Sequence, residues 1–178
     1  RVYNMGGSRS AGSASGSIAL QEVVEGGSTP LLFAARSGDV DSARILVAAG
    51  ADVEDVAGDG NTALVIATHS GHATLAAYLL EAGADPNRSP LGYTALHAAV
   101  LRGTLRDRLT RNDDVAAGRK IVRALLQRGA DPDARLERGT PVRRWSHDFA
   151  FMDRWVGATP YWLAAKFLET ELMETLAE

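Results

Sequence analysis

Between residues 28 and 178, apolar and small residues recur in short blocks that each begin with threonine followed by proline or alanine. Inside a block these residues lie three and four positions apart, as in Leu31, Ala34 and Ala35, which is the spacing of one face of an amphipathic helix. A threonine can cap the free N–H groups at a helix start, and proline suits the first helical position. The pattern predicts four short helices, which start after Thr29, Thr62, Thr94 and Thr159.

A second apolar block follows the first in every unit. In the first unit Gly38 ends one helix, and Leu46 and Val47 mark the next. Gly50 then supplies the left-handed turn with which helices commonly end. The chain continues as an extended finger to a Gly- and Asn-containing turn at 58–61. Each unit is therefore predicted to be a helix, a turn, a second helix and a finger.

Two independent sequence motifs recur with the same period along the chain. The first two block threonines, Thr29 and Thr62, are 33 residues apart, and the next, Thr94, follows after 32. The tripeptide Gly-Ala-Asp recurs with the second helices, at Gly50, Gly83 and Gly129. Repeats of this length bury a continuous core by stacking on their neighbours, so the period predicts an all-α solenoid.

Two intervals exceed the period and predict inserts. Gly103 and Gly129 are 26 residues apart, whereas the corresponding interval in each of the first two units is 12. The predicted organisation is a flexible Gly/Ser-rich arm at 1–16, a capping helix at 17–27, repeats at 28–60, 61–92 and 93–138, an incomplete repeat at 157–178, and inserts at 104–117 and 139–156. The last repeat lacks Gly-Ala-Asp, and we expect a further repeat to follow it in the intact protein.

The Thr-Pro-Leu, Leu-His-Ala-Ala and Gly-Ala-Asp motifs of residues 28–178 resemble those of the ankyrin-repeat family. The resemblance implies an ankyrin solenoid that binds a protein partner and has no catalysis of its own. Within the family, the segments 139–144 and 157–167 resemble a bacterial subgroup that is often predicted to be exported, which implies an exported or periplasmic protein. The two inserts depart from the family pattern, so binding residues cannot be transferred from it directly.

Charge is distributed unevenly along a chain whose net charge is −3. Residues 101–155 hold 13 Lys or Arg against 8 Asp or Glu, a balance of +5, which leaves −8 for the remainder. The chain contains no cysteine, so disulfides and thiolate metal sites are excluded. A continuous apolar run of about 18 residues is absent, so no direct membrane span is expected.

The second insert is the first candidate binding site. Arginines and large aromatics, the residue types enriched at binding hot spots, gather in it. The candidate residues are Arg143, Arg144, Trp145, His147, Phe149, Phe151, Arg154 and Trp155. The alternative is that the aromatics fold back and fill the space beside the last repeat, because exposed apolar patches are unfavourable unless covered. Both hold if some aromatics anchor the loop while the arginines face outward.

The concave surface of the solenoid is the second candidate. By motif position, residues near the ends of the first helices face this surface, together with residues of the fingers. They are Arg36, His69, Leu101 and Arg102 on the helices, and Asp59 and Tyr93 on the fingers. Simple solvent exposure is the alternative for any one of them.

The first insert carries arginines that could meet an acidic partner or a phosphate. Asp107, Asp113 and Asp114 are interleaved with Arg106, Arg108 and Arg111. A self-neutralised, solvated loop is the favoured interpretation. Nucleic-acid binding is not expected, because it needs a continuous basic face and the chain as a whole is acidic.

The histidines do not form an enzymatic or metal-binding pattern. His69 and His72 lie on either side of a turn glycine and have no third ligand at helical spacing. His97 is predicted to hydrogen-bond with Thr94, and His147 has no Ser or Cys in a nucleophile context. We therefore expect no catalytic residue, no cofactor and no metal.

Together these features predict an adaptor or scaffold that binds a protein partner through its finger loops and concave groove. The alternative is a permanent structural subunit of a larger protein complex, including one associated with a membrane.

Overall fold

The computed structural model describes residues 3–4, 21–22, 27–58, 60–104, 112–139 and 151–177. The helices of this part of the chain form four consecutive pairs. They are α1 (Pro30–Ser37) with α2 (Val40–Ala48), α3 (Ala63–Ser70) with α4 (Ala73–Glu81), α5 (Ala95–Thr104) with α6 (Asn112–Gln127), and α7 (Pro160–Lys166) with α8 (Thr170–Ala177). The predicted fold class, an all-α solenoid of helix pairs, is confirmed.

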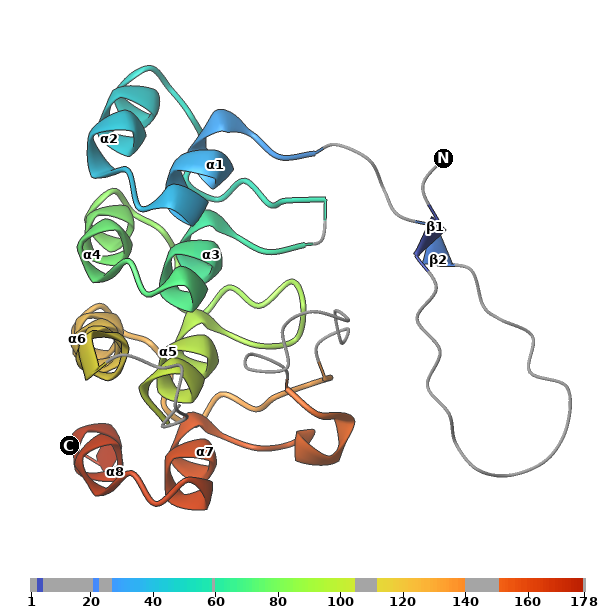
Figure 1. Cartoon of the computed structure of the whole chain (residues 1–178), viewed down its shortest axis with the longest axis vertical. Coiled ribbons are helices and arrows are strands. Elements are labelled where there is room, and N and C mark those ends of the chain that lie inside the picture. Colours follow the sequence, from blue (N-terminus) through green and yellow to red (C-terminus); the bar gives the residue numbers. More distant parts are fainter. Residues whose placement is uncertain are drawn as a thin grey trace, which may run out of the picture.

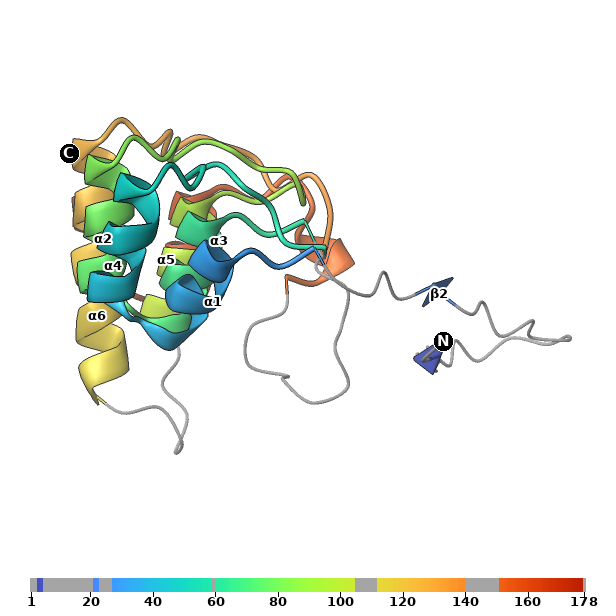
Figure 2. The same ribbon diagram turned by 90° about the horizontal axis from the view of Figure 1, so that it is seen from above.

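The helices lie in two layers (Figure 1). The inner layer consists of α1, α3, α5 and α7, each packed against the next, and the outer layer consists of α2, α4, α6 and α8, which follow the same order. The segments that connect the pairs, the fingers, project from the inner layer on the side away from the outer layer (Figure 2). Neighbouring repeats therefore place equivalent positions side by side.

The block threonines stand at the starts of the inner helices, and all but Thr29 offer a side-chain cap. Thr62 Oγ1 accepts the N–H of Val65 at 3.2 Å, and Thr159 Oγ1 accepts that of Trp162 at 3.1 Å. Such caps satisfy donors that a helix start leaves unpaired. Thr29 makes no side-chain cap and its hydroxyl is buried without a partner among the described residues, so the predicted cap is wrong there. Pro30 at the first helical position does not account for this, because Thr159 caps α7 although Pro160 follows it.

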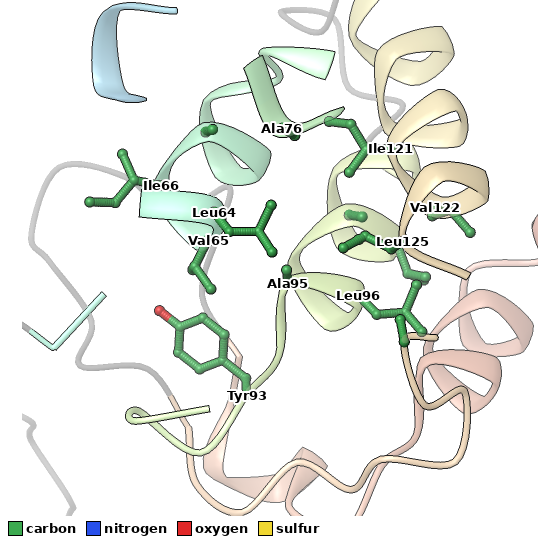
Figure 3. Close-up of a cluster of buried hydrophobic side chains, with 14 of the residues drawn as sticks. Leu64, Val65, Ile66, Ala76, Tyr93, Ala95, Leu96, Ile121, Val122 and Leu125 are labelled. Atoms are coloured by element: carbon green, nitrogen blue, oxygen red, sulfur yellow. The ribbon is translucent and has the colours of Figure 1, made fainter. Parts of the chain in front are cut away.

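The core lies between the layers and continues from repeat to repeat. Leu64 of α3, Leu96 of α5 and Leu125 of α6 are buried and point into one shared interior (Figure 3). Because α3 has α1 on one side and α5 on the other, all residues from Ala63 to Thr68 are buried. Burying each leucine contributes about 1.5–3 kcal/mol.

The segment before the first repeat differs from the prediction of a capping helix at 17–27. Within it, Gln21–Glu22 form strand β2, which pairs antiparallel with β1 (Tyr3–Asn4) in the register Tyr3 to Glu22. The helix prediction is therefore wrong at these two residues, and the flexible-arm prediction is wrong at Tyr3 and Asn4. A helix of this length is marginal in isolation, whereas pairing satisfies the same backbone groups across two segments. Gly27, at the end of the predicted capping helix, lies in no helix, and the other residues of both predicted segments lie outside the described residues.

The first insert is partly helical. The sequence predicted an insert over 104–117, but α5 extends to Thr104 and α6 begins at Asn112, so α6 has 16 residues where α2 and α4 each have 9. The prediction of a solvated loop is therefore wrong for residues 112–117, which are helical. Gly118 lets α6 cross α5 closely: a Cβ on Gly118 would lie 2.7 Å from the backbone nitrogen of Gly103. Arg106, Arg108, Arg111 and Asp107 lie outside the described residues.

Candidate partner-binding surface

A basic residue occupies the last turn of every inner helix. These residues, the inner-helix row, are Arg36 of α1, His69 of α3, Arg102 of α5 and Lys166 of α7. Among the described residues, the last turns of the outer helices contain no basic residue. Arg36 and Lys166 are exposed, and His69 and Arg102 are half-buried. The predicted surface residues Arg36, His69 and Arg102 are thus brought onto one edge of the inner layer.

Contacts between repeats hold this edge together. Arg102 donates from a guanidinium nitrogen to the carbonyl oxygen of His69 at 2.6 Å, and a Cβ on Gly71 would overlap its guanidinium. A cation at this position favourably meets the negative end of the α3 dipole. In the preceding repeat, the imidazole Nε2 of His72 lies 3.1 Å from the carbonyl oxygen of Arg36. Adjacent helix ends are therefore linked directly.

Lys166 is the member of the row that the sequence analysis missed. Its Nζ lies 5.5 Å from the ring centroid of Trp162, 5.6 Å from that of Trp155 and 6.0 Å from that of Phe167. These distances are those of cation–π contacts. A signal was present in the sequence, because Lys166 follows Thr159 by seven residues, as Arg36 follows Thr29.

Four residues predicted to face a partner belong to the core instead. Tyr93, Leu101, Phe151 and Trp155 are at most 7% exposed. The Tyr93 hydroxyl lies 2.8 Å from Asn61 Oδ1, and its ring lies 5.0 Å from that of Phe151. The prediction of partner contact is wrong for these four, and the alternative that aromatics of the second insert fold back is right for Phe151 and Trp155. Burying the rings of Phe151 and Trp155 removes a large apolar area from water, which stabilises the folded chain more than leaving the rings exposed on the surface would.

The described ends of the second insert lie close together. The N–H of Leu136 donates to the carbonyl of Ala158 at 2.8 Å, and the N–H of Gly157 donates to the carbonyl of Leu136 at 2.7 Å. A Cβ on Gly139 would lie 2.7 Å from the carbonyl oxygen of Phe151. After this close approach comes the short 3₁₀ helix η2 (Asp153–Trp155), in which Arg154 is exposed.

Several predicted binding residues are not described. These are Asp59, Arg143, Arg144, Trp145, His147 and Phe149, which lie outside the described residues.

His97 has a structural role at the junction of the last two repeats. The N–H of Thr94 donates to His97 Nδ1 at 3.2 Å, so Nδ1 is an acceptor and the protonated Nε2 donates to the carbonyl of Ala158 at 3.3 Å. The predicted contact with Thr94 is confirmed. Burial lowers the pKa of His97 to about 4, so the imidazole is neutral near pH 7.

Comparison with known proteins identifies the repeat. A family model described as ankyrin repeats (3 copies) matches residues 14–90 and 31–178. The chain belongs to the ankyrin-repeat family. Ankyrin repeats are generally protein–protein interaction modules, and ankyrin-repeat proteins are typically non-enzymatic binding scaffolds. No curated protein matched the chain.

The described part of the ankyrin-repeat structure offers neither a membrane-spanning helix nor a metal-binding cluster. Within the described ranges, none of the helices has the length and apolar character needed to cross a membrane. The same residues contain no group of three His, Asp or Glu side chains positioned to hold a metal ion.

Proposed function

We propose that this protein is an adaptor that binds a protein partner through the inner-helix row and the neighbouring fingers. The observation that supports the proposal is the recurrence of a basic residue in the last turn of all four inner helices. Packing alone needs no such recurrence, because the outer helices form the same stack without it.

The proposed surface includes the second insert. Arg154 is exposed close to the point where the insert rejoins the body. The remaining proposed members lie outside the described residues and are proposed for their residue types, since Arg, Trp and other aromatics are common binding hot spots. They are Arg143, Arg144, Trp145 and Phe149.

Hydrogen bonds between repeats support a preorganised surface. Glu54 Oε1 accepts the N–H of Asp85 at 2.7 Å. In the next repeat Asn87 accepts the N–H of Asp131 at 2.7 Å and donates to the carbonyl of Gly129 at 2.9 Å. A surface that is already ordered loses less conformational entropy when it binds.

A permanent structural subunit is the second candidate, and exposed apolar side chains at the two ends of the stack favour it. In the first helix pair Phe33 and Ile45 are 60% and 70% exposed, and after α7 Leu168 is 83% exposed. Exposed apolar residues that gather at such faces commonly mark contact surfaces. A permanent subunit would copurify in fixed stoichiometry and aggregate alone, whereas an adaptor would be a folded monomer that binds reversibly.

The experiment is affinity purification with the whole chain from its source organism, identification of the captured proteins by mass spectrometry, and titration of each purified candidate. Arg144→Ala and Trp145→Ala are expected to weaken reversible binding. The matched control is Arg123→Ala, which removes an exposed arginine from the outer helix α6. Binding that neither variant alters would refute the role proposed for the insert.

A further inference from the structure

Each end of the helix stack exposes positions that are buried in the other repeats. The pair α7–α8 forms one end (Figure 1). Tyr161 and Trp162, the second and third residues of α7, are 41% and 44% exposed, whereas the corresponding residues of α1, α3 and α5 are at most 3% exposed. Among the described residues, no inner helix covers α7 on the side away from α5. This side of the last repeat, with Leu168 in the turn that follows α7, is termed the end face.

The first repeat, at the other end, shows the opposite pattern. Its inner helix exposes its fourth residue, Phe33, whereas the fourth residues of α3, α5 and α7 are buried. In its outer helix, Ser42 stands where α4 has the buried Leu75. A shallow hollow on this side of the repeat, which is termed the start face, is lined mainly by Pro30, Phe33, Ser37, Asp39, Ser42 and Leu46.

The two faces are the two halves of one contact. Within the chain, a repeat turns its end-face positions toward the next repeat and its start-face positions toward the preceding one. The inner helices make this contact three times, between α1 and α3, between α3 and α5, and between α5 and α7. A second copy of the chain therefore offers, on its start face, the half of the contact that the end face lacks.

We propose that the end face of one copy of this chain docks on the start face of a second copy, so that the stack of repeats continues from copy to copy. The two copies use different faces, which makes the contact heterologous. Each pair keeps one free end face and one free start face, so further copies can be added. The proposal goes beyond the adaptor function, because the association needs no partner protein.

Leu168 gives the end face a feature that the first two repeats lack. It occupies the position of the turn glycines Gly38 and Gly71, it has a φ of 59°, and its side chain is exposed. Glycine adopts this conformation without a steric cost, whereas leucine does not. In a single copy, Leu168 therefore strains the backbone while its side chain stays in water. Docking accounts for the leucine, because the contact buries its side chain.

Between repeats of the chain, the turn position leaves no space for a side chain. A Cβ on Gly38 would lie 2.5 Å from Nδ1 of His72, and a Cβ on Gly71 would overlap the guanidinium of Arg102. His72 and Arg102 belong to the repeats that follow these glycines. A following repeat with side chains of this size would therefore clash with a leucine in the turn.

The start face has the space that Leu168 needs. In the first repeat, the positions of His72 and Arg102 are occupied by Asp39 and Ser37, which have smaller side chains and line the hollow. A stack that continues in the same register brings Leu168 of one copy to the hollow of the next. Its apolar side chain leaves water there, which is favourable.

Charge favours the same register. Nε2 of His72 lies 3.1 Å from the carbonyl oxygen of Arg36, so these two positions adjoin across a repeat boundary. Across the boundary between two copies, Lys166 takes the position of Arg36 and Asp39 of the second copy takes that of His72. Both Lys166 and Asp39 are exposed, and their charges are opposite. Complementary charges of this kind help to fix the register of a contact.

The test measures the molar mass of the whole chain by sedimentation at several concentrations. A range from about 5 µM to about 500 µM covers weak and transient interfaces. We expect the average mass to rise with concentration beyond that of a dimer, because a heterologous contact does not close at two copies. A chain that stays monomeric over this range, or that stops at a dimer, would overturn the proposal.

Two charged variants each block one face. Leu168→Glu blocks the end face and Phe33→Glu blocks the start face, and each should weaken the contact at least about tenfold, because docking would bury an unpaired carboxylate. Each variant alone should stay monomeric where the wild type associates. An equimolar mixture should form a dimer that does not grow, since one intact end face meets one intact start face. Association of either variant alone, or a mixture that stays monomeric, would contradict docking of end face on start face.

The matched control is Val56→Glu, which adds the same charge at an exposed apolar residue in the finger between the first two helix pairs. This control should associate as the wild type does, and an equal loss in the control would count against the proposed faces. Circular dichroism verifies that each variant is folded. Leu168→Gly removes the side chain without adding a charge and relieves the positive φ, so it should stay folded and still associate more weakly. Association of Leu168→Gly as tight as that of the wild type would refute the role of Leu168.

Discussion

Replacing Phe151 with alanine tests whether the second insert returns into the core. Phe151 is fully buried, its ring centroid lies 5.0 Å from that of Tyr93, and it meets His97 edge-on at 6.1 Å. A residue in this position stabilises the last two repeats. A residue that only contacts a partner would not affect stability.

The expected loss is large. Phe→Ala substitutions in cores cost about 3–5 kcal/mol, a value that includes the cavity left behind. The ring contacts with Tyr93 and His97 place Phe151 within this range, since aromatic pairs add about 0.5–1.5 kcal/mol beyond burial. A typical domain is stable by about 5–15 kcal/mol, so Phe151→Ala removes a substantial fraction of the total. For a chain of this length the midpoint of thermal unfolding should fall by roughly 10 °C.

Urea unfolding followed by circular dichroism measures the effect. The adjacent Met152, which is 42% exposed, provides the control: Met152→Ala should change the free energy of unfolding by about 0.5 kcal/mol or less. In a repeat protein the loss can appear as earlier unfolding of α7 and α8, so a separate first transition also supports the reasoning. A loss below about 1 kcal/mol in Phe151→Ala would refute the buried position of the ring.

Three further changes have expected outcomes. Gly118→Ala should lower stability by about 1–3 kcal/mol in urea unfolding, although alanine favours helices, because its Cβ meets the backbone of Gly103; no loss would contradict the close crossing of α5 and α6. Leu168→Gly should raise stability by about 0.5–1 kcal/mol in the same assay, since Leu168 has a φ of 59° and is exposed; a loss would show that its side chain makes a stabilising contact. His97 should make the protein less stable in acid: its pKa is about 4 in the folded state against 6.5 unfolded, so the unfolded state binds the proton first. Its contribution is fully present above pH 6.5 and falls by about 3 kcal/mol as the pH drops to 4. Equal pH dependence in His97→Gln and wild type would contradict this.

The repeat could be predicted from the sequence because its signals are local. Thr62 and Thr159 precede helix starts, and Gly38 and Gly71 end inner helices with positive φ. Each signal acts within a few residues of itself. The prediction of a capping threonine failed at Thr29, which precedes its helix but makes no side-chain hydrogen bond there.

The burial of the aromatics could not be predicted in the same way. Phe151 and Trp155 are buried because the chain returns at Ala158 to pair with Leu136, and this contact is distant in sequence. Tyr93 is covered as a consequence, since Phe151 packs on it. The residue types of the second insert suggested a binding loop. Whether its aromatic side chains bind a partner or pack in the core depends on the path of the chain, which residue type does not reveal.

The candidate surface was predicted in part. Arg36, His69 and Arg102 followed from their place in the repeat, whereas Lys166 was missed even though it occupies the corresponding place in the last repeat. The rings that surround Lys166 come from η2 and from α7 with its C-terminal cap, so their gathering depends on the same return of the insert.

Hydrogen–deuterium exchange of the whole chain, with and without the partner recovered by affinity purification, tests the adaptor account most directly. The account predicts that partner binding slows exchange in the last turns of α1, α3, α5 and α7 and in residues 139–156, and leaves the outer helices α2 and α4 unchanged. Slower exchange confined to the outer helices, or to the apolar ends of the stack, would contradict it.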